Sequence, residues 1–331
     1  MNPSVHSPGL FSETIPARTV EEQQRRKAAV MTILGKGLPT LPSYVLDLNA
    51  LLSHPTVDLK KVGKVIRTDP SLSAQVIRLC NSALFGLRRR VFTIEQATVL
   101  LGTQRLRTLV LSSSVMEFSG RQLPQTTVHA FWQHSFMAAL LSEKIARQLD
   151  YCEKEQAYLG GLLHDIGQLP LTMTVFNEEA HRRPAPPAGW RDNPQVERAY
   201  FGLDHCEAGR WMGIAWNFMP SFIDVFEYHH ATDMAQHDPY LVGIVTAADQ
   251  FLKLQTADDA NAEAEGEGKP EADKVFFLEE CLPELVETER VALLEMLNNE
   301  YVHLLPLVQL GLALSSGNGG EPQTGDAGEL R

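Results

Sequence analysis

Hydrophobic residues along most of the chain recur every three or four positions, the spacing that places them on one face of an α-helix. In "PSLSAQVIRLC", for example, Leu72, Val76 and Leu79 fall on one such face. Residues 69–70 separate this helix from the one before it, and Gly102 predicts the end of a later helix. No run alternates convincingly between apolar and polar positions, as a half-buried strand would. We therefore expect an all-α fold.

The same pattern separates ordered from disordered segments. Residues 1–27 are polar with scattered prolines, and residues 314–331 are rich in glycine, so both ends are expected to be disordered. Residues 255–273 contain seven acidic residues, one lysine and no large apolar side chain, which predicts an acidic linker. An ordered body over residues 28–254 and a helical segment over residues 274–313 remain.

Composition narrows the class of protein. With 44% hydrophobic and 21% charged residues among 331, the chain is typical of a globular protein, and its formal net charge of -12 disfavours a nucleic-acid partner. The four cysteines are far apart and form no CxxC pair, so reduced thiols fit better than a disulfide framework. Neither a signal peptide nor a membrane-spanning stretch is evident, and we expect a cytoplasmic protein that does not bind membranes.

The stretch "TIEQATVLLGTQRLRTLVL", flanked and interrupted by arginines, resembles a helix-turn-helix in rhythm. A tight helical hairpin with a solvated basic face explains it better, because apolar residues fill the supposed recognition helix. A transcription regulator is therefore the least favoured hypothesis.

Two ionisable residues fall on the apolar faces of predicted helices. His134 lies on the inward stripe of "FWQHSFMAALLSEKIARQL", and Asp249 lies on that of "LVGIVTAADQFLKL". A buried carboxylate without a partner is very costly, so Asp249 needs a cation, a metal or several donors. We expect both residues to converge in space with His164 and Asp165, which end the apolar helix of "YLGGLLHDIGQLPL".

Three further histidines stand at the ends of helical segments beside small or apolar residues. Together, five histidines and two aspartates come from five separate segments, and imidazole nitrogen with carboxylate oxygen suits zinc, iron or manganese. The candidate metal ligands are His134, His164, Asp165, His205, His229, His230 and Asp249. A buried hydrogen-bonded polar network is the alternative explanation.

The order of these residues resembles the H…HD…D signature of the HD superfamily of metal-dependent phosphohydrolases. The additional histidines resemble the extra ligands of the HD-GYP cyclic-di-GMP phosphodiesterases. Over residues 36–250 the chain is more similar to the HDOD family, an HD-related output domain of bacterial signalling proteins, through "LPTLP", "DPSLSAQVIRLCNSALFG", "GGLLHDIGQL" and "HCEAGRWM". The resemblance implies an N-terminal helical subdomain, residues 28–125, packed on an HD-like helical subdomain, residues 126–254, with one or two divalent ions (Fe, Mn or Zn) as the implied cofactor.

Two departures from the HD-GYP pattern bear on chemistry. Gln168 stands where those enzymes have a lysine that can neutralise a phosphate, and no Gly-Tyr-Pro loop follows His230. The favoured hypothesis is thus a signal-transduction module that binds a signalling protein or a small nucleotide, without efficient catalysis. The alternative is a phosphohydrolase acting on a nucleotide or cyclic dinucleotide, with Asp165 as the catalytic residue. The sequence does not predict the oligomeric state.

Overall fold

The computed structural model describes residues 24, 27–32, 59–67, 70–81, 90–176, 185–187, 189–265 and 271–316. Every regular element in these residues is helical, and no strand occurs among them, which confirms the predicted all-α class. Most residues of the two chain ends that are expected to be disordered, 1–27 and 314–331, lie outside the described residues. None of the described helices is long and apolar enough to cross a membrane.

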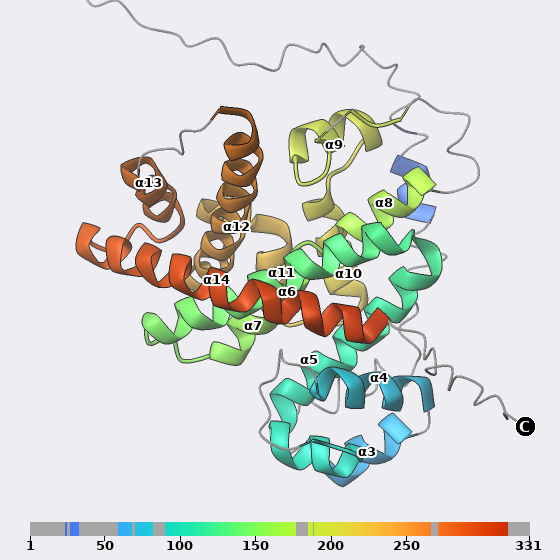
Figure 1. Cartoon of the computed structure of the whole chain (residues 1–331). Coiled ribbons are helices and arrows are strands. Elements are labelled where there is room, and N and C mark those ends of the chain that lie inside the picture. Colours follow the sequence, from blue (N-terminus) through green and yellow to red (C-terminus); the bar gives the residue numbers. More distant parts are fainter. Residues whose placement is uncertain are drawn as a thin grey trace, which may run out of the picture.

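Three helices form one end of the molecule (Figure 1). They are α3 (Leu59–Arg67), α4 (Pro70–Cys80) and α5 (Ile94–Gln122). The predicted inward stripe of α4 is confirmed, because Leu72, Val76 and Leu79 are buried. The predicted break at Gly102 is a kink within α5, where this residue has φ 71°, a conformation that glycine adopts readily. Beyond the kink, α5 runs towards the larger group of helices.

Helix α6 (Gln125–Gln148) is the central helix of that larger group. It packs against α7 (Lys154–Leu163), α12 (Pro239–Glu265) and α14 (Glu287–Ser316). Its buried face includes Trp132, Phe136 and Leu141, which belong to one continuous core. This packing fixes α6 and α12 side by side, so that polar residues on their inward faces can meet.

Four shorter helices close the core beside α6 and α12. They are α8 (Gln168–Phe176), α9 (Pro194–Phe201), α10 (His205–Ala215) and α11 (Pro220–Tyr228), followed by a 3-10 turn over Thr232–Met234. Side-chain caps define two of their starts, since Asn193 accepts from the backbone of α9 and Asp204 from that of α10. The second cap fixes the position of His205, the first residue of α10.

The prediction of an acidic linker over residues 255–273 is wrong in part. Helix α12 continues to Glu265, and α13 (Glu271–Cys281) begins before residue 273. Alanine and glutamate, which dominate this stretch, have high helix propensity even without an apolar face. Gln255 also donates to Asn298 of α14 at 3.3 Å. The expected C-terminal helical segment consists of α13 and α14, and α14 extends three residues beyond its expected end at residue 313.

Candidate metal centre

The structure brings side chains from five helices to one place in the core. His134 belongs to α6, His164 and Asp165 follow α7 directly, His205 opens α10, and Asp249 lies in α12. The remaining two, His229 and His230, follow the last residue of α11. All seven residues predicted from the sequence therefore lie in or beside one cluster.

Two glycines around the His-Asp pair allow the helices to come this close. A Cβ atom on Gly161 would lie 2.7 Å from the carbonyl oxygen of Ala138 in α6. A Cβ atom on Gly167 would lie only 1.9 Å from the carbonyl oxygen of His205 in α10. Since real Cβ atoms do not approach so closely, only glycine at these positions lets His164 and Asp165 reach α6 and α10.

The first half of the cluster contains two imidazoles and two carboxylates. The Nε2 atom of His134 lies 3.3 Å from Nε2 of His164 and 3.2 Å from Oδ1 of Asp249. The Nε2 atom of His164 lies 3.6 Å from both Oδ2 of Asp165 and Oδ1 of Asp249. The predicted convergence of these four residues is confirmed. His134 itself lies at the edge of the core, with 28% of its side chain exposed.

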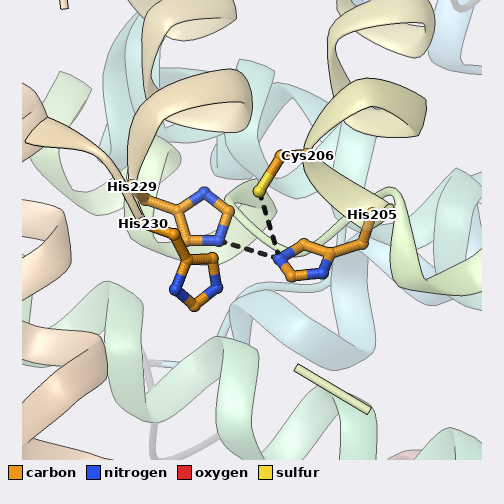
Figure 2. Close-up of side chains that lie close together, drawn as sticks. All are labelled: His205, Cys206, His229 and His230. Carbon is orange, nitrogen blue, oxygen red and sulfur yellow. Dashed lines mark hydrogen bonds between the residues drawn. The ribbon is translucent and has the colours of Figure 1, made fainter. Parts of the chain in front are cut away.

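The second half of the cluster lies on the other oxygen of Asp165. Its Oδ1 atom is 3.4 Å from Nε2 of His205 and 3.5 Å from Nε2 of His229. These two Nε2 atoms are 3.1 Å apart (Figure 2). Both side chains are fully buried. Asp165 thus stands between two groups of ligand-type atoms, one on each carboxylate oxygen.

His230 lies at the rim of the second half. Its Nε2 atom is 3.1 Å from Oδ1 of Asp192, whose other oxygen accepts from Nζ of Lys253 at 2.6 Å. Lys253 also donates to Oδ2 of Asp249 at 2.5 Å. The lysine therefore pairs with both carboxylates, and Oδ1 of Asp249 faces the imidazoles.

Hydrogen bonds on the far side of three buried rings fix which nitrogen faces the cluster. The Nδ1 atoms of His164, His229 and His205 lie 2.8, 2.9 and 2.6 Å from the oxygens of Gly161, Val225 and Glu197, respectively. Carbonyl and carboxylate oxygens only accept, so each Nδ1 carries the hydrogen and each neutral ring presents a lone pair at Nε2.

These lone pairs face one another and two buried carboxylate oxygens. Oδ1 of Asp165 and Oδ1 of Asp249 have no hydrogen-bond partner of acceptable geometry, although both are buried. Lone pairs that converge without a donor repel one another, and unpaired buried carboxylate oxygen is costly. A divalent cation would satisfy all of these atoms, so the cluster fits a metal ion and is able to hold one.

Without an ion, the pKa values of the buried groups follow from the same contacts. Burial lowers the pKa of His164, but the carboxylates of Asp165 and Asp249 outweigh burial and raise it to about 9. Burial and the neighbouring His230 lower the pKa of His229 to about 3. Burial raises the pKa of Asp249, yet Lys253 and the imidazoles hold it well below its usual range. A proton on His164 therefore takes the place that a metal ion would occupy electrostatically.

Sequence reasoning missed Glu197, the carboxylate that orients His205. This side chain is fully buried in α9 and accepts from both Nδ1 and the backbone N–H of His205, at 2.6 and 2.8 Å. It also accepts from Nε2 of Gln168 at 2.8 Å and from the backbone N–H of Asp192 at 3.1 Å. Its position one turn before buried Phe201 was the available signal, an acidic residue on an apolar stripe.

Two adjoining cavities open beside His134. The smaller, of about 270 Å³, is lined by His134, Asp165, Gln168, Arg191 and Lys253 together with Leu123 and apolar side chains of α6, α8 and α12. The larger, of about 660 Å³, extends along α6 towards Tyr301 of α14. Both are lined by His134 and Leu252, so the first half of the cluster can be reached from either cavity.

An all-α core that holds a His, His-Asp, Asp cluster defines a protein of the HD type. The family model for the HDOD domain matches residues 38–232, more than half of the chain, and the chain belongs to this family. Asp249 lies beyond the matched residues, so the structure, rather than the family match, places it in the cluster.

Solved structures share the fold. An HDOD domain protein of unknown function from Geobacter sulfurreducens is 22% identical, with TM-score 0.65 over 87% of this chain and 98% of that one. A candidate phosphohydrolase from Shewanella amazonensis is 25% identical, with TM-score 0.64 and the same coverage. A candidate signal transduction protein from Marinobacter aquaeolei is 18% identical, with TM-score 0.63 over 92% of this chain and 68% of that one. The chain spans only 43% and 31% of the two curated relatives it matches.

Proposed function

We propose that the protein is a bacterial signal-transduction module of the HDOD type that acts by binding, and that its HD-type cluster holds one or two divalent metal ions. The observation that carries the metal part is the convergence of Nε2 lone pairs on two buried carboxylate oxygens without donors. His134, His164, Asp165 and Asp249 would hold the first ion, and Asp165, His205 and His229 the second, with His230 at the rim.

Binding without efficient turnover is supported by the environment of Gln168. Its amide donates to Glu197, which itself accepts from His205, so Gln168 contacts the cluster only through Glu197 in these hydrogen bonds. A neutral amide in this place cannot supply the charge that a lysine gives to a phosphate. After His230, the chain forms a short 3-10 turn over Thr232–Met234, and Asp224 accepts from the backbone of Gln236 and His237, which follow this turn. This turn stands where HD-GYP enzymes have their Gly-Tyr-Pro loop.

A small anionic ligand is the partner that the smaller cavity suits best. Its volume of about 270 Å³ lies just below the ~300–1,000 Å³ typical of small-molecule sites, so it suits a small ligand. Arg191 lines this cavity and has no carboxylate partner among the described residues, whereas its apolar wall includes Phe131 and Leu169. A nucleotide would place its phosphate near Arg191 and its base against the apolar wall.

Metal analysis tests the proposal directly. Protein purified without a histidine tag should carry one to two equivalents of zinc, iron or manganese, measured by mass spectrometry of the metal. Asp165→Ala removes the carboxylate shared by both halves and should lose most of the metal and a few kcal/mol of stability. Asp233→Ala, in the exposed 3-10 turn, is the matched control. Wild-type protein that stays metal-free at saturating zinc would contradict the proposal.

A phosphohydrolase is the second candidate because the cavity is not devoid of positive charge. Arg191 lines it beside the cluster without a carboxylate partner among the described residues, and it could replace the lysine missing at residue 168. A bound metal would lower the pKa of a water and polarise phosphate oxygens. Cyclic dinucleotides, nucleotides and a generic phosphodiester should be assayed with manganese, iron and zinc. Robust hydrolysis by wild type, lost in folded Asp165→Ala, would favour the enzyme over the binding module.

A further inference from the structure

Cys206 lies inside the second half of the cluster. It follows His205 at the start of α10, is 5% exposed, and places Sγ 3.5 Å from Nε2 of His205 (Figure 2). Ligand-type atoms of Cys206, His205, His229 and His230 all lie within 4.8 Å of one another. The thiol therefore points at the same space as the two buried imidazoles.

A hydrogen bond alone does not account for this arrangement. When the His205 ring is neutral, a neutral thiol could donate its S–H to the lone pair of His205 Nε2. That single proton would still leave Nε2 of His229, 3.1 Å from His205 Nε2, and Oδ1 of Asp165 without donors. One weak donor cannot satisfy three acceptors.

Four separations in the structure match edges of a tetrahedral metal site. With Zn–N bonds of ~2.05 Å and a Zn–S bond of ~2.3 Å, tetrahedral geometry separates two nitrogen ligands by ~3.3 Å and nitrogen from sulfur by ~3.6 Å. The observed separations are 3.1 Å for His205 Nε2 to His229 Nε2 and 3.5 Å for His205 Nε2 to Cys206 Sγ. Oδ1 of Asp165 lies 3.4 and 3.5 Å from the same two nitrogens.

We propose that Cys206 is a thiolate ligand of the second ion, completing a set with His205, His229 and Oδ1 of Asp165. This inference rests on the proposed metal-binding function and specifies its second half. His230 is not required for four-coordination, because Asp192 engages its Nε2 atom. On binding, the thiol loses its proton to solvent and the sulfur bonds the ion.

The two halves then differ in ligand softness. Two imidazoles with oxygens of Asp165 and Asp249 suit manganese or iron as well as zinc, whereas a thiolate selects zinc, cobalt or iron(II) over manganese and magnesium. The second half is accordingly a site for a borderline-soft divalent cation, and the chain could hold two different metals at once.

Cobalt(II) spectroscopy on the full chain tests the inference. Cobalt-loaded wild type should show an intense near-ultraviolet thiolate-to-cobalt band, and Cys206→Ser and Cys206→Ala should lose it. Cys152→Ser, which changes the exposed cysteine, should keep the band. Zinc affinity should fall at least about 10- to 100-fold in Cys206→Ser, the loss seen when even an outer partner of a ligand is removed, with manganese affinity unchanged.

The outcomes separate the two proposals. Cobalt bound at one to two equivalents without a thiolate band would overturn the role of Cys206 and leave the metal-binding function standing. A band that persists in both Cys206 variants would also overturn it. Wild-type protein that binds no cobalt or zinc would overturn the metal-binding function itself. Circular dichroism of each variant establishes that the chain is folded before loading.

Discussion

Glu197→Gln changes a single buried group and tests how the second half of the cluster is oriented. In wild type, one oxygen of Glu197 accepts from both Nδ1 and the backbone N–H of His205, and the other accepts from Gln168 and from the backbone N–H of Asp192. An amide nitrogen in place of the first oxygen would face two N–H groups, so donor would oppose donor. The ring of His205 relieves this conflict by moving its hydrogen to Nε2, which removes the lone pair directed at the cluster.

The expected cost follows from the contacts. Loss of an orienting partner of a metal-bound histidine typically lowers metal affinity about 10- to 100-fold, equivalent to about 1.4–2.8 kcal/mol. Folding stability without metal should fall by about 1–3 kcal/mol, because a backbone N–H and a ring N–H lose a charged acceptor in a fully buried place. The metal effect should be confined to the ion in the second half of the cluster, since the described hydrogen bonds of Glu197 reach His205, Gln168 and Asp192 and none of the first-half ligands.

Zinc titration against a chelating indicator, with urea unfolding of the metal-free protein, measures both quantities. Glu207→Gln is the matched control, because Glu207 is the same residue type in α10 but pairs with Lys27 at the surface. The control should change neither quantity by more than about 0.5 kcal/mol. Wild-type zinc affinity in folded Glu197→Gln would refute the assignment of Nε2 of His205 as a metal ligand.

Three further predictions follow from the packing and the charges. Gly167→Ala should lower the free energy of unfolding in urea by several kcal/mol and abolish metal binding, because its Cβ would clash with the backbone of α10. Gly189→Ala, the control, should lower the free energy of unfolding by only ~1–2 kcal/mol, the cost of a left-handed backbone for a residue other than glycine. Lys253→Met should lower stability by about 3 kcal/mol, since it leaves buried Asp249 without its cation, and saturating zinc should restore part of this. The third prediction concerns Asp224. Burial raises the pKa of this carboxyl, but backbone and side-chain donors of His237 hold it below its usual value. Its stabilisation is therefore present above the unfolded pKa of ~3.9 and lost as pH falls through the folded pKa. The stability difference between wild type and Asp224→Asn should shrink on acidification, and a difference that grows would contradict this sign.

The helical spacing of apolar residues and the positions of glycine and proline were sufficient to predict the all-α fold, the break at Gly102 and the burial of Asp249. These features depend on residues within one or two turns, which a sequence displays directly. The inward placement of His134 and Asp249 also predicted that they converge with His164 and Asp165, because a buried polar side chain needs a partner from another segment. The extent of α12 was not predicted, since a helix rich in alanine and glutamate lacks an apolar stripe where it leaves the core.

Only the tertiary structure decided how the cluster is organised. The partners on Nδ1, namely the oxygens of Gly161, Val225 and Glu197, fix the ring nitrogens that face inward. Gly161 and Val225 stand only three and four residues before their histidines, so these two choices depend on how α7 and α11 end, whereas Glu197 reaches His205 from a different helix, α9. The division of Asp165 between two groups of imidazoles and the approach of Cys206 to His205 depend on side-chain directions at helix termini. Helical spacing shows which face of a helix a residue occupies. The packing of α7 against α6, and of α10 against the turn at Gly167, sets the distances between the side chains of the cluster. Differences of a few ångströms in these distances decide whether the cluster is a buried polar network or a metal site.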